Sequence, residues 1–123
     1  MRERGPFPHS GPVHRLDDLV AAVERIEGVR RTELLPGDRL LVATRNSIYS
    51  LVVQDDGSFE VAGGWFQRMG RGAVRLGVSG CSAGGTALFT RVVAAPGLFL
   101  EFEDGTRTTR IQRVRLQRLA AAS

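Results

Sequence analysis

The period of the hydrophobic positions changes once along the chain, from a helical period near the N-terminus to an alternating one afterwards. Five residues recur at helical spacing and form one apolar stripe: Leu16, Leu19, Val20, Val23 and Ile26. Asp17 and Asp18 fall in the first turn, where the helix dipole favours negative charge. Gly28 is placed to end the helix in a left-handed conformation. The pattern therefore predicts a helix over residues 16–27.

From residue 35 onward, short apolar segments with a period of two alternate with turn signals. The predicted strands cover residues 39–45, 47–53, 59–61, 73–79, 87–93 and 98–103. The turn signals between them are Leu35–Asp38, Asp55–Ser58, Pro96–Gly97 and Asp104–Gly105. The last segment fits a helix or a strand, and the alternation of Val114 and Leu116 favours a strand through Leu116.

Several short strands separated by turns are typical of an all-β protein. The sequence predicts a mainly β fold, a small antiparallel β-barrel or sandwich of about five to seven strands with one N-terminal α-helix. A length of 123 residues favours one domain, here residues 15–123, after a lead-in over residues 1–14 that is rich in glycine and proline. The predicted core positions are Leu19, Val23, Val42, Leu51, Val53, Val74, Leu76, Leu100 and Phe102.

All seventeen basic residues are arginines, and their charge is unevenly distributed. Residues 1–60 carry eight arginines and ten acids, a net charge of −2, whereas residues 61–123 carry nine arginines and three acids, a net charge of +6. Such asymmetry indicates an anionic partner or a solvated face whose acids lie nearby in space. A GC-rich genome also produces an excess of arginine without any functional reason.

The sequence gives no indication of a bound cofactor or of a membrane partner. Cys81 is the single cysteine, so the chain has no internal disulfide. His9 and His14 have no further Cys or His to complete a metal site, and we expect neither a metal nor a cofactor. No apolar run approaches the ~20 residues of a membrane span, and the N-terminus lacks the apolar centre of a secretory signal. We therefore expect a cytoplasmic protein without a membrane partner.

The segment Gly80–Gly85, GCSAGG, matches the G-x-S-x-G pattern of the esterase nucleophile elbow. That elbow needs a helix directly after the serine, and the residues after Ser82 are poor helix formers. Both histidines precede Ser82, which is the wrong order for the elbow. A hydrolase using Ser82 or Cys81 is thus the remote alternative, and we expect no enzyme. Cys81 is expected to be buried beside glycines that permit a bend.

Two groups of residues are candidates for binding. Trp65 follows two glycines and could stack on a base, or it could fill one end of the core. The candidate binding residues are Trp65, Arg68, Arg71, Arg75, Arg107, Arg113 and Arg115, and the candidate structural glycines are Gly63, Gly64, Gly84 and Gly85. With an unbroken period of two, Arg107, Arg113 and Arg115 share one face with Ile111, while Arg110 and Arg118 share the other with Val114 and Leu116.

Two functional hypotheses remain close together. The first is a non-enzymatic β-barrel module that binds nucleic acid or another acidic macromolecule through arginines. The second is a structural, assembly or protein-interaction protein, including a homo-oligomer, that has no anionic ligand. An exposed Trp65 beside a contiguous arginine surface would favour the first hypothesis. Arginines interleaved in space with acids would favour the second.

Overall fold

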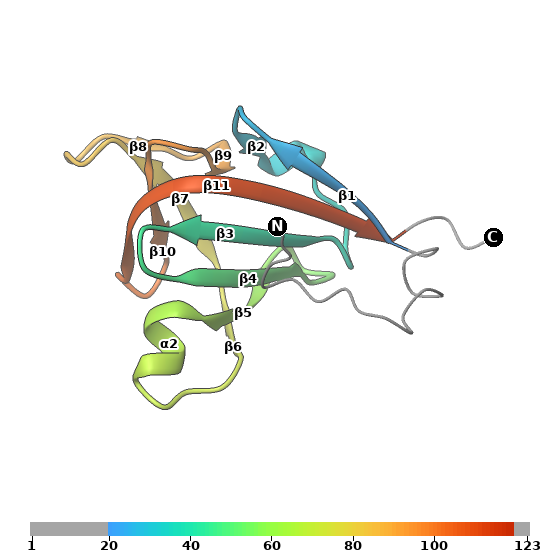
Figure 1. Cartoon of the computed structure of the whole chain (residues 1–123), viewed down its shortest axis with the longest axis horizontal. Coiled ribbons are helices and arrows are strands. Elements are labelled where there is room, and N and C mark those ends of the chain that lie inside the picture. Colours follow the sequence, from blue (N-terminus) through green and yellow to red (C-terminus); the bar gives the residue numbers. More distant parts are fainter. Residues whose placement is uncertain (1–19, 120–123) are drawn as a thin grey trace.

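The protein is mainly β, with antiparallel sheets and one short helix (Figure 1). The structure is a computed structural model and describes residues 20–119. Its strands are β1 (Val20–Arg25), β2 (Val29–Arg30), β3 (Arg39–Thr44), β4 (Ile48–Val53), β5 (Phe59–Gly63), β6 (Val74–Leu76), β7 (Val78–Ser82), β8 (Leu88–Phe89), β9 (Val92–Ala94), β10 (Phe99–Phe102) and β11 (Arg107–Leu119). A 3₁₀ turn, η2 (Arg31–Glu33), and a helix, α2 (Gly64–Arg68), complete the elements of this range.

The long strand β11 organises the main sheet. Nine strands belong to this sheet, eight of them in the order β6-β5-β4-β3-β11-β10-β7-β8, with β1 paired to β11 as the ninth. β11 has thirteen residues, of which residues 111–117 pair with β3 along one edge. Along the other edge β11 pairs first with β10 and then with β1. A small second sheet joins β2 and β9.

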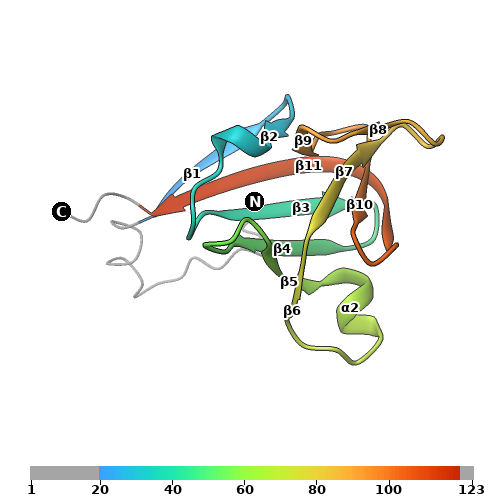
Figure 2. The same cartoon turned by 180° about the vertical axis from the view of Figure 1, so that it is seen from behind.

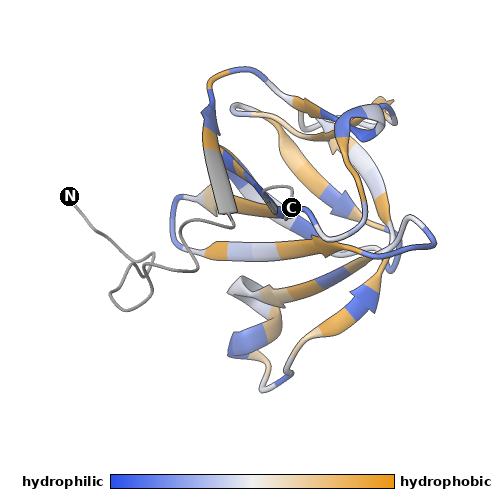
Figure 3. Ribbon diagram, turned by 90° about the vertical axis from the view of Figure 1, so that its right-hand side faces the viewer, coloured by the Kyte–Doolittle hydropathy of each residue, from blue (hydrophilic) through white to orange (hydrophobic). Residues whose placement is uncertain are grey.

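Of the two predicted alternatives, a barrel or a sandwich, the barrel is wrong, because the hydrogen-bonded order of the sheet has two ends. No pairing among residues 20–119 joins β6 to β8. The sheet nevertheless bends strongly, since β6 passes through the single residue Gly77 into β7, which pairs with β10 instead of β5. Seen from the side, the strands curve around a common interior (Figure 3), and α2 lies at one end next to β5 and β6 (Figure 2).

The predicted N-terminal helix is wrong over the part of the chain that the structure describes, while Leu16 and Leu19 lie outside it. Residues 20–25 form β1, which pairs with the second half of β11, with Val23 opposite Leu116. The edge of β11 offers residues 20–25 a strand to pair with, which the helical periodicity of the sequence cannot reveal. This pairing overrides the local preference for a helix. Two residues of the predicted stripe whose burial the structure describes are not buried: Val23 is 50% exposed and Ile26 is 88% exposed. Val23 is therefore not a core residue.

The core lies between the bent strands and follows their alternation. β3 and β4 bury alternate residues, and β5 and β10 do the same where they cross the interior. The predicted core residues Val42, Leu51, Val53, Leu100 and Phe102 are buried, whereas Val74 and Leu76 are half-buried and pack against the core. The structure confirms the predicted β3–β4 and β10–β11 hairpins and the turns that precede or follow them. It also confirms the predicted strand through Leu116.

Two irregularities in the pairing of β11 change which of its side chains face outward. The register shifts opposite β10 between Phe99 and Glu101, and opposite β3 between Ile111 and Arg113. Such bulges insert an extra residue and shift the alternation. As a result, Ile111 and Val114 are both buried although they are three residues apart, and the predicted shared face of Arg113 and Ile111 is wrong. Among the β11 side chains that the structure describes, Thr108, Ile111, Val114 and Leu116 are buried, whereas Arg107, Arg110 and Arg113 are exposed.

Candidate functional site

The segment that resembles an esterase elbow forms the end of a strand. β7 continues through Gly80, Cys81 and Ser82, so the predicted interruption of the strand after Ser79 is wrong. The chain then bends, with Gly84 at φ +111°, and returns as β8. Gly84 adopts a conformation that side-chain-bearing residues rarely adopt, whereas Gly85 has no such φ and open space around it. No helix follows Ser82, so the geometry of an esterase elbow is not present here.

Ser82 is joined to two other side chains in a small polar cluster. Ser82 is 1% exposed, and its Oγ donates a hydrogen bond to Glu101 Oε2 at 2.5 Å. Arg107 Nε donates to the same carboxylate oxygen at 2.8 Å. The residues come from β7, β10 and β11, and the residues described here include no histidine, since His9 and His14 lie outside them. The Ser82 hydroxyl is therefore covered by the protein and donates to a carboxylate that Arg107 also binds.

The sequence alone did not reveal the role of Glu101. Glu101 lies in a stretch of acids that is typical of a solvated strand end, yet its carboxylate binds Ser82 and Arg107. The signal that points to it is the alternation of residues 98–103, which places Phe99 and Glu101 on one face of β10. Phe99 is also contacted from that face, by Arg110 at 4.8 Å from its ring centroid and by Arg107 at 5.8 Å.

Cys81 is a buried thiol with its own hydrogen-bond acceptor. Its Sγ donates to the backbone carbonyl of Val93 at 3.3 Å. Burial raises the pKa of the Cys81 thiol from 9.0 to about 11. The thiol is therefore protonated at neutral pH, and a protonated, buried thiol is a poor nucleophile.

Trp65 lies in α2 and packs against the edge of the core. Its ring meets that of Phe66 edge-on, with 5.2 Å between the centroids, and the Arg71 guanidinium lies 5.9 Å from the Trp65 centroid. The Trp65 backbone N–H donates to the Tyr49 hydroxyl at 3.1 Å. The Tyr49 ring also fills the space that a Cβ at Gly64 would occupy. Trp65 is half-buried and packs against the core.

The candidate arginines fall into two groups on different elements. Arg68, Arg71 and Arg75 lie on α2, the following loop and β6. Arg107, Arg113 and Arg115 lie on β11, and the order of the sheet places β5, β4 and β3 between β6 and β11. No hydrogen bond or ion pair of the described residues joins the two groups.

Carboxylates are interleaved with the arginines of β11. Glu101 pairs with Arg107 at 2.8 Å. Glu24 lies between two others, with its oxygens 3.4 Å from Arg113 Nε and 3.6 Å from Arg115 Nη2. Cross-strand pairing also brings Glu60 opposite Arg75. The positive charge of this region is thus partly balanced in space, which sequence separation had hidden.

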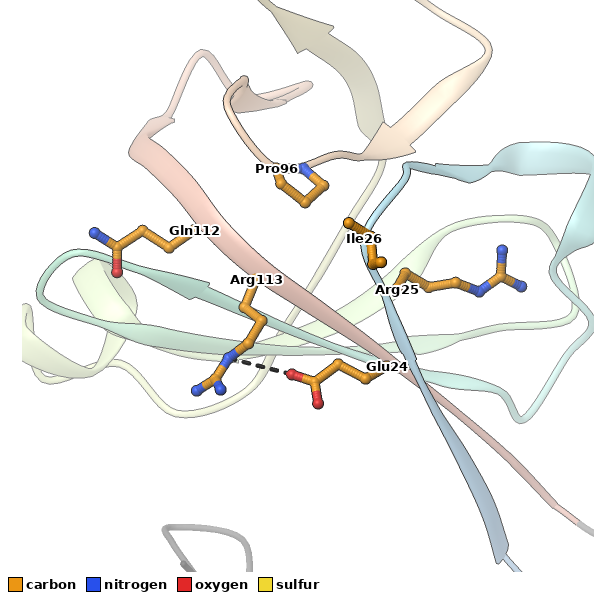
Figure 4. Close-up of a pocket in the computed structure, with 6 residues that line it drawn as sticks. All are labelled: Glu24, Arg25, Ile26, Pro96, Gln112 and Arg113. Carbon is orange, nitrogen blue, oxygen red and sulfur yellow. Dashed lines mark ion pairs between the residues drawn. The ribbon is translucent and has the colours of Figure 1, made fainter. Parts of the chain in front are cut away.

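A cleft of about 430 Å³ opens where two strands meet the same edge of β11 (Figure 4). β10 follows this edge as far as Ile111, which bonds to Gly97 and Leu98, and β1 takes over at Val114. The gap between them forms the cleft. Its lining residues are Glu24, Arg25, Ile26, Pro96, Gln112 and Arg113. No sequence pattern indicated this cleft, because the strands that bound it are distant along the chain.

Residues 83–90, which we call the β8 arm, form an exposed and uncharged segment. All eight are exposed and none is charged. β8 pairs with β7 through Leu88 and Phe89 and is the last strand in the order of the sheet. Leu88 is 38% exposed and Phe89 is 47% exposed. Figure 1 shows the arm extending away from the rest of the sheet.

Comparisons with known proteins give no relative. No family model, no curated protein and no solved structure matches the chain. Within residues 20–119, no group of three or more His, Cys, Asp or Glu side chains could hold a metal ion. None of the helices in this range is long and apolar enough to cross a membrane.

Proposed function

We propose that this protein is a non-enzymatic binding module that engages a protein partner through the β8 arm. The observation that carries the proposal is the exposure of Leu88 and Phe89 on a strand with a free edge among the described residues. Exposed apolar side chains and unpaired strand edges both favour association with another polypeptide. An extended segment of the partner would add a strand beside β8 and cover these two side chains.

Two further observations support binding without catalysis. The hydroxyl of Ser82 is committed to Glu101, and the thiol of Cys81 is buried and protonated. The acids interleaved with the arginines of β11 favour a partner that is not a polyanion at that surface. A protein partner that contacts the uncharged arm requires no desolvation of charged groups at the contact.

Selection from a library of random peptides displayed on phage tests this function. Phe89→Ser and Leu88→Ser remove the apolar contacts of the arm, and Met69→Ser removes an exposed apolar side chain of similar size from the turn after α2. Peptides selected on the wild type are expected to bind Met69→Ser equally and to lose at least tenfold in affinity for Phe89→Ser. No enrichment of any peptide, or equal binding to all four proteins, would show that the arm is not a binding surface.

A polyanion is the second candidate partner, at a different place. Among the residues that the structure describes, no carboxylate pairs with Arg68 or Arg71. Arg68 donates to Ser47 Oγ and Arg71 lies over the Trp65 and Phe66 rings. These guanidinium groups keep hydrogen-bond donors available for a phosphate.

Measuring the binding of fluorescent single-stranded and duplex DNA across salt concentrations tests this second candidate function. The double variant Arg68→Ala, Arg71→Ala should weaken binding and lower the salt slope, whereas Arg39→Ala, Arg91→Ala removes equal charge elsewhere and should not.

A further inference from the structure

We infer that the segment that adds to the β8 arm is acidic, and that its carboxylates lie at the Thr90 end of the arm. The inference rests on the proposed function, since it names the charge of the partner that the same arm binds by strand addition. It depends on the arginines beside the arm, because the arm itself carries no charge. Charge complementarity of this kind selects among partners more than it adds affinity.

Three exposed arginines lie where the chain leaves the arm: Arg30, Arg31 and Arg91. Arg91 follows the arm directly, and the Arg31 backbone N–H donates to its carbonyl at 2.9 Å. The Arg31 side chain reaches the arm itself, since its Nη2 donates to the Thr90 carbonyl at 2.9 Å. Arg30 lies opposite Val92 where β2 pairs with β9, and Figures 1 and 2 both show these strands beside β8. Positive charge is therefore concentrated at the Thr90 end of the arm.

No carboxylate of the described residues forms an ion pair with these three arginines. The ion pairs within residues 20–119 involve other guanidinium groups, namely those of Arg25, Arg107, Arg113, Arg115 and Arg118. Glu33 is the nearest acid along the chain, and it is held by Arg25 at 3.0 Å and by the Arg30 backbone N–H at 2.8 Å. The chain has no acid between Glu60 and Glu101. An acidic partner would therefore supply the countercharge that this end of the arm lacks.

The other end of the arm, at Gly85, already has a carboxylate beside its arginine. Arg107 Nη2 donates to the Gly85 carbonyl at 3.5 Å, and Arg107 Nε binds the Glu101 carboxylate at 2.8 Å. Arg110 also lies on β11, and β10 and β7 separate this strand from β8. The two ends of the arm therefore differ in charge, which gives the bound segment a direction.

Strand addition fits the way in which the apolar side chains of β8 point. Leu88 lies opposite Ser82 and Phe89 lies opposite Cys81 in β7. The two side chains therefore face opposite sides of the sheet, and an added strand, which has side chains on both faces, can cover each of them. Every strand pair of the described residues is antiparallel. An antiparallel segment places its N-terminal half beside Thr90, so its acids precede its apolar residues.

Selection from a displayed peptide library on the full chain in three forms tests the inference. The forms are the wild type, Arg91→Glu and Arg39→Glu. The two variants have the same net charge, and Arg39 is an exposed residue of β3, which β11, β10 and β7 separate from β8. Peptides selected at low salt on the wild type and on Arg39→Glu should be enriched in acids that precede apolar residues. Peptides selected on Arg91→Glu should lose this enrichment.

The affinities of one enriched peptide measure the effect directly. Replacing one of its acids by glutamine should weaken binding to the wild type about two- to fivefold, which is the range of an exposed ion pair. The peptide should also bind Arg91→Glu about fivefold more weakly than Arg39→Glu. Both differences should shrink at about 0.5 M salt, because exposed charges are then screened. The loss caused by Phe89→Ser should persist at that salt concentration, because it removes an apolar contact.

The outcomes separate this inference from the proposed function. Arm-dependent peptides without an excess of acids, or with an equal excess on Arg91→Glu and Arg39→Glu, overturn the inference and leave the proposed function standing. Acids that follow the apolar residues overturn it as well, because they would lie at the Gly85 end of the arm. If no selected peptide loses affinity for Phe89→Ser, both the inference and the proposed function fail.

A nucleic acid is the competing partner for these arginines. Fluorescent single-stranded DNA that binds Arg39→Glu but not Arg91→Glu, together with selected peptides that lack acids, would assign the Thr90 end to a nucleic acid and overturn the inference. Circular dichroism checks that each variant is folded. Arg91→Gln removes the charge without reversing it, and it replaces Arg91→Glu in these measurements if the reversal disturbs the fold.

Discussion

Ser82 and Glu101 are joined by a hydrogen bond of 2.5 Å, although they lie nineteen residues apart in the chain. The bond links the end of β7 to β10, and Arg107 on β11 donates to the same carboxylate oxygen. The serine of the hydrolase-like motif therefore has a structural partner, Glu101, on the neighbouring strand.

Ser82→Ala should lower the free energy of unfolding by about 1.5 kcal/mol, because it removes one hydrogen bond to a carboxylate while Arg107 still satisfies Glu101. Urea denaturation measures the change. The wild type should also resist a fluorophosphonate probe of serine hydrolases. Labelling of the wild type that disappears in Ser82→Ala would contradict the structural role and restore the catalytic hypothesis.

Cys81 should make the protein less stable at alkaline pH. In the unfolded chain the thiol ionises near pH 9.0, whereas in the folded protein its pKa is about 11. The folded state therefore holds its proton between these values while the unfolded state has lost it, so stability is full below pH 9 and falls as pH rises towards 11. The loss should be on the order of 2 kcal/mol.

Denaturation curves of the wild type and of Cys81→Ala across pH 8–11 measure this effect. Other groups also titrate in this range, so the relevant quantity is the difference between the two proteins. That difference should change with pH in the direction that disfavours the wild type. Equal slopes for both proteins would show that the thiol is not shielded in the fold.

Leu100→Ala should be far more costly than Val23→Ala, although both residues were predicted to belong to the core. Leu100 is fully buried in β10, and truncating a buried leucine typically costs about 2–5 kcal/mol. Val23 is half-exposed on β1, and its truncation should cost less than about 1 kcal/mol. Guanidinium melts measure both. A large loss for Val23→Ala would mean that β1 packs more deeply than its exposure indicates.

Gly64→Ala should be strongly destabilising because of two separate effects. Gly64 has φ +52°, and an added Cβ would overlap the ring of Tyr49. Gly57→Ala is the matched control, since Gly57 has φ +87° but open space around it. The control measures conformational strain alone, about 1 kcal/mol. Gly64→Ala should cost several times as much in a thermal melt, and equal losses would show that the Tyr49 ring moves aside.

The sequence by itself determined the elements whose signals are local. The hairpin of β3 and β4 follows from alternating residues around a short turn, and Asp104–Gly105 places the turn between β10 and β11. Alternation also identified the buried residues of β10, because neighbouring side chains of a strand point to opposite faces. The lack of a helix after Ser82 was enough to argue against the esterase elbow.

Only the tertiary structure decided the features that depend on a distant partner. Residues 20–25 carry a helical stripe, yet β11 offers them an edge and they form β1. The bulge between Ile111 and Arg113 is invisible in the sequence, because it arises from the mismatch between β11 and β3. The partners of Glu101, the cleft beside Ile26 and the free edge of β8 likewise depend on which strands meet. Strand pairing is a contact between remote segments, so a periodicity of a few residues cannot specify it.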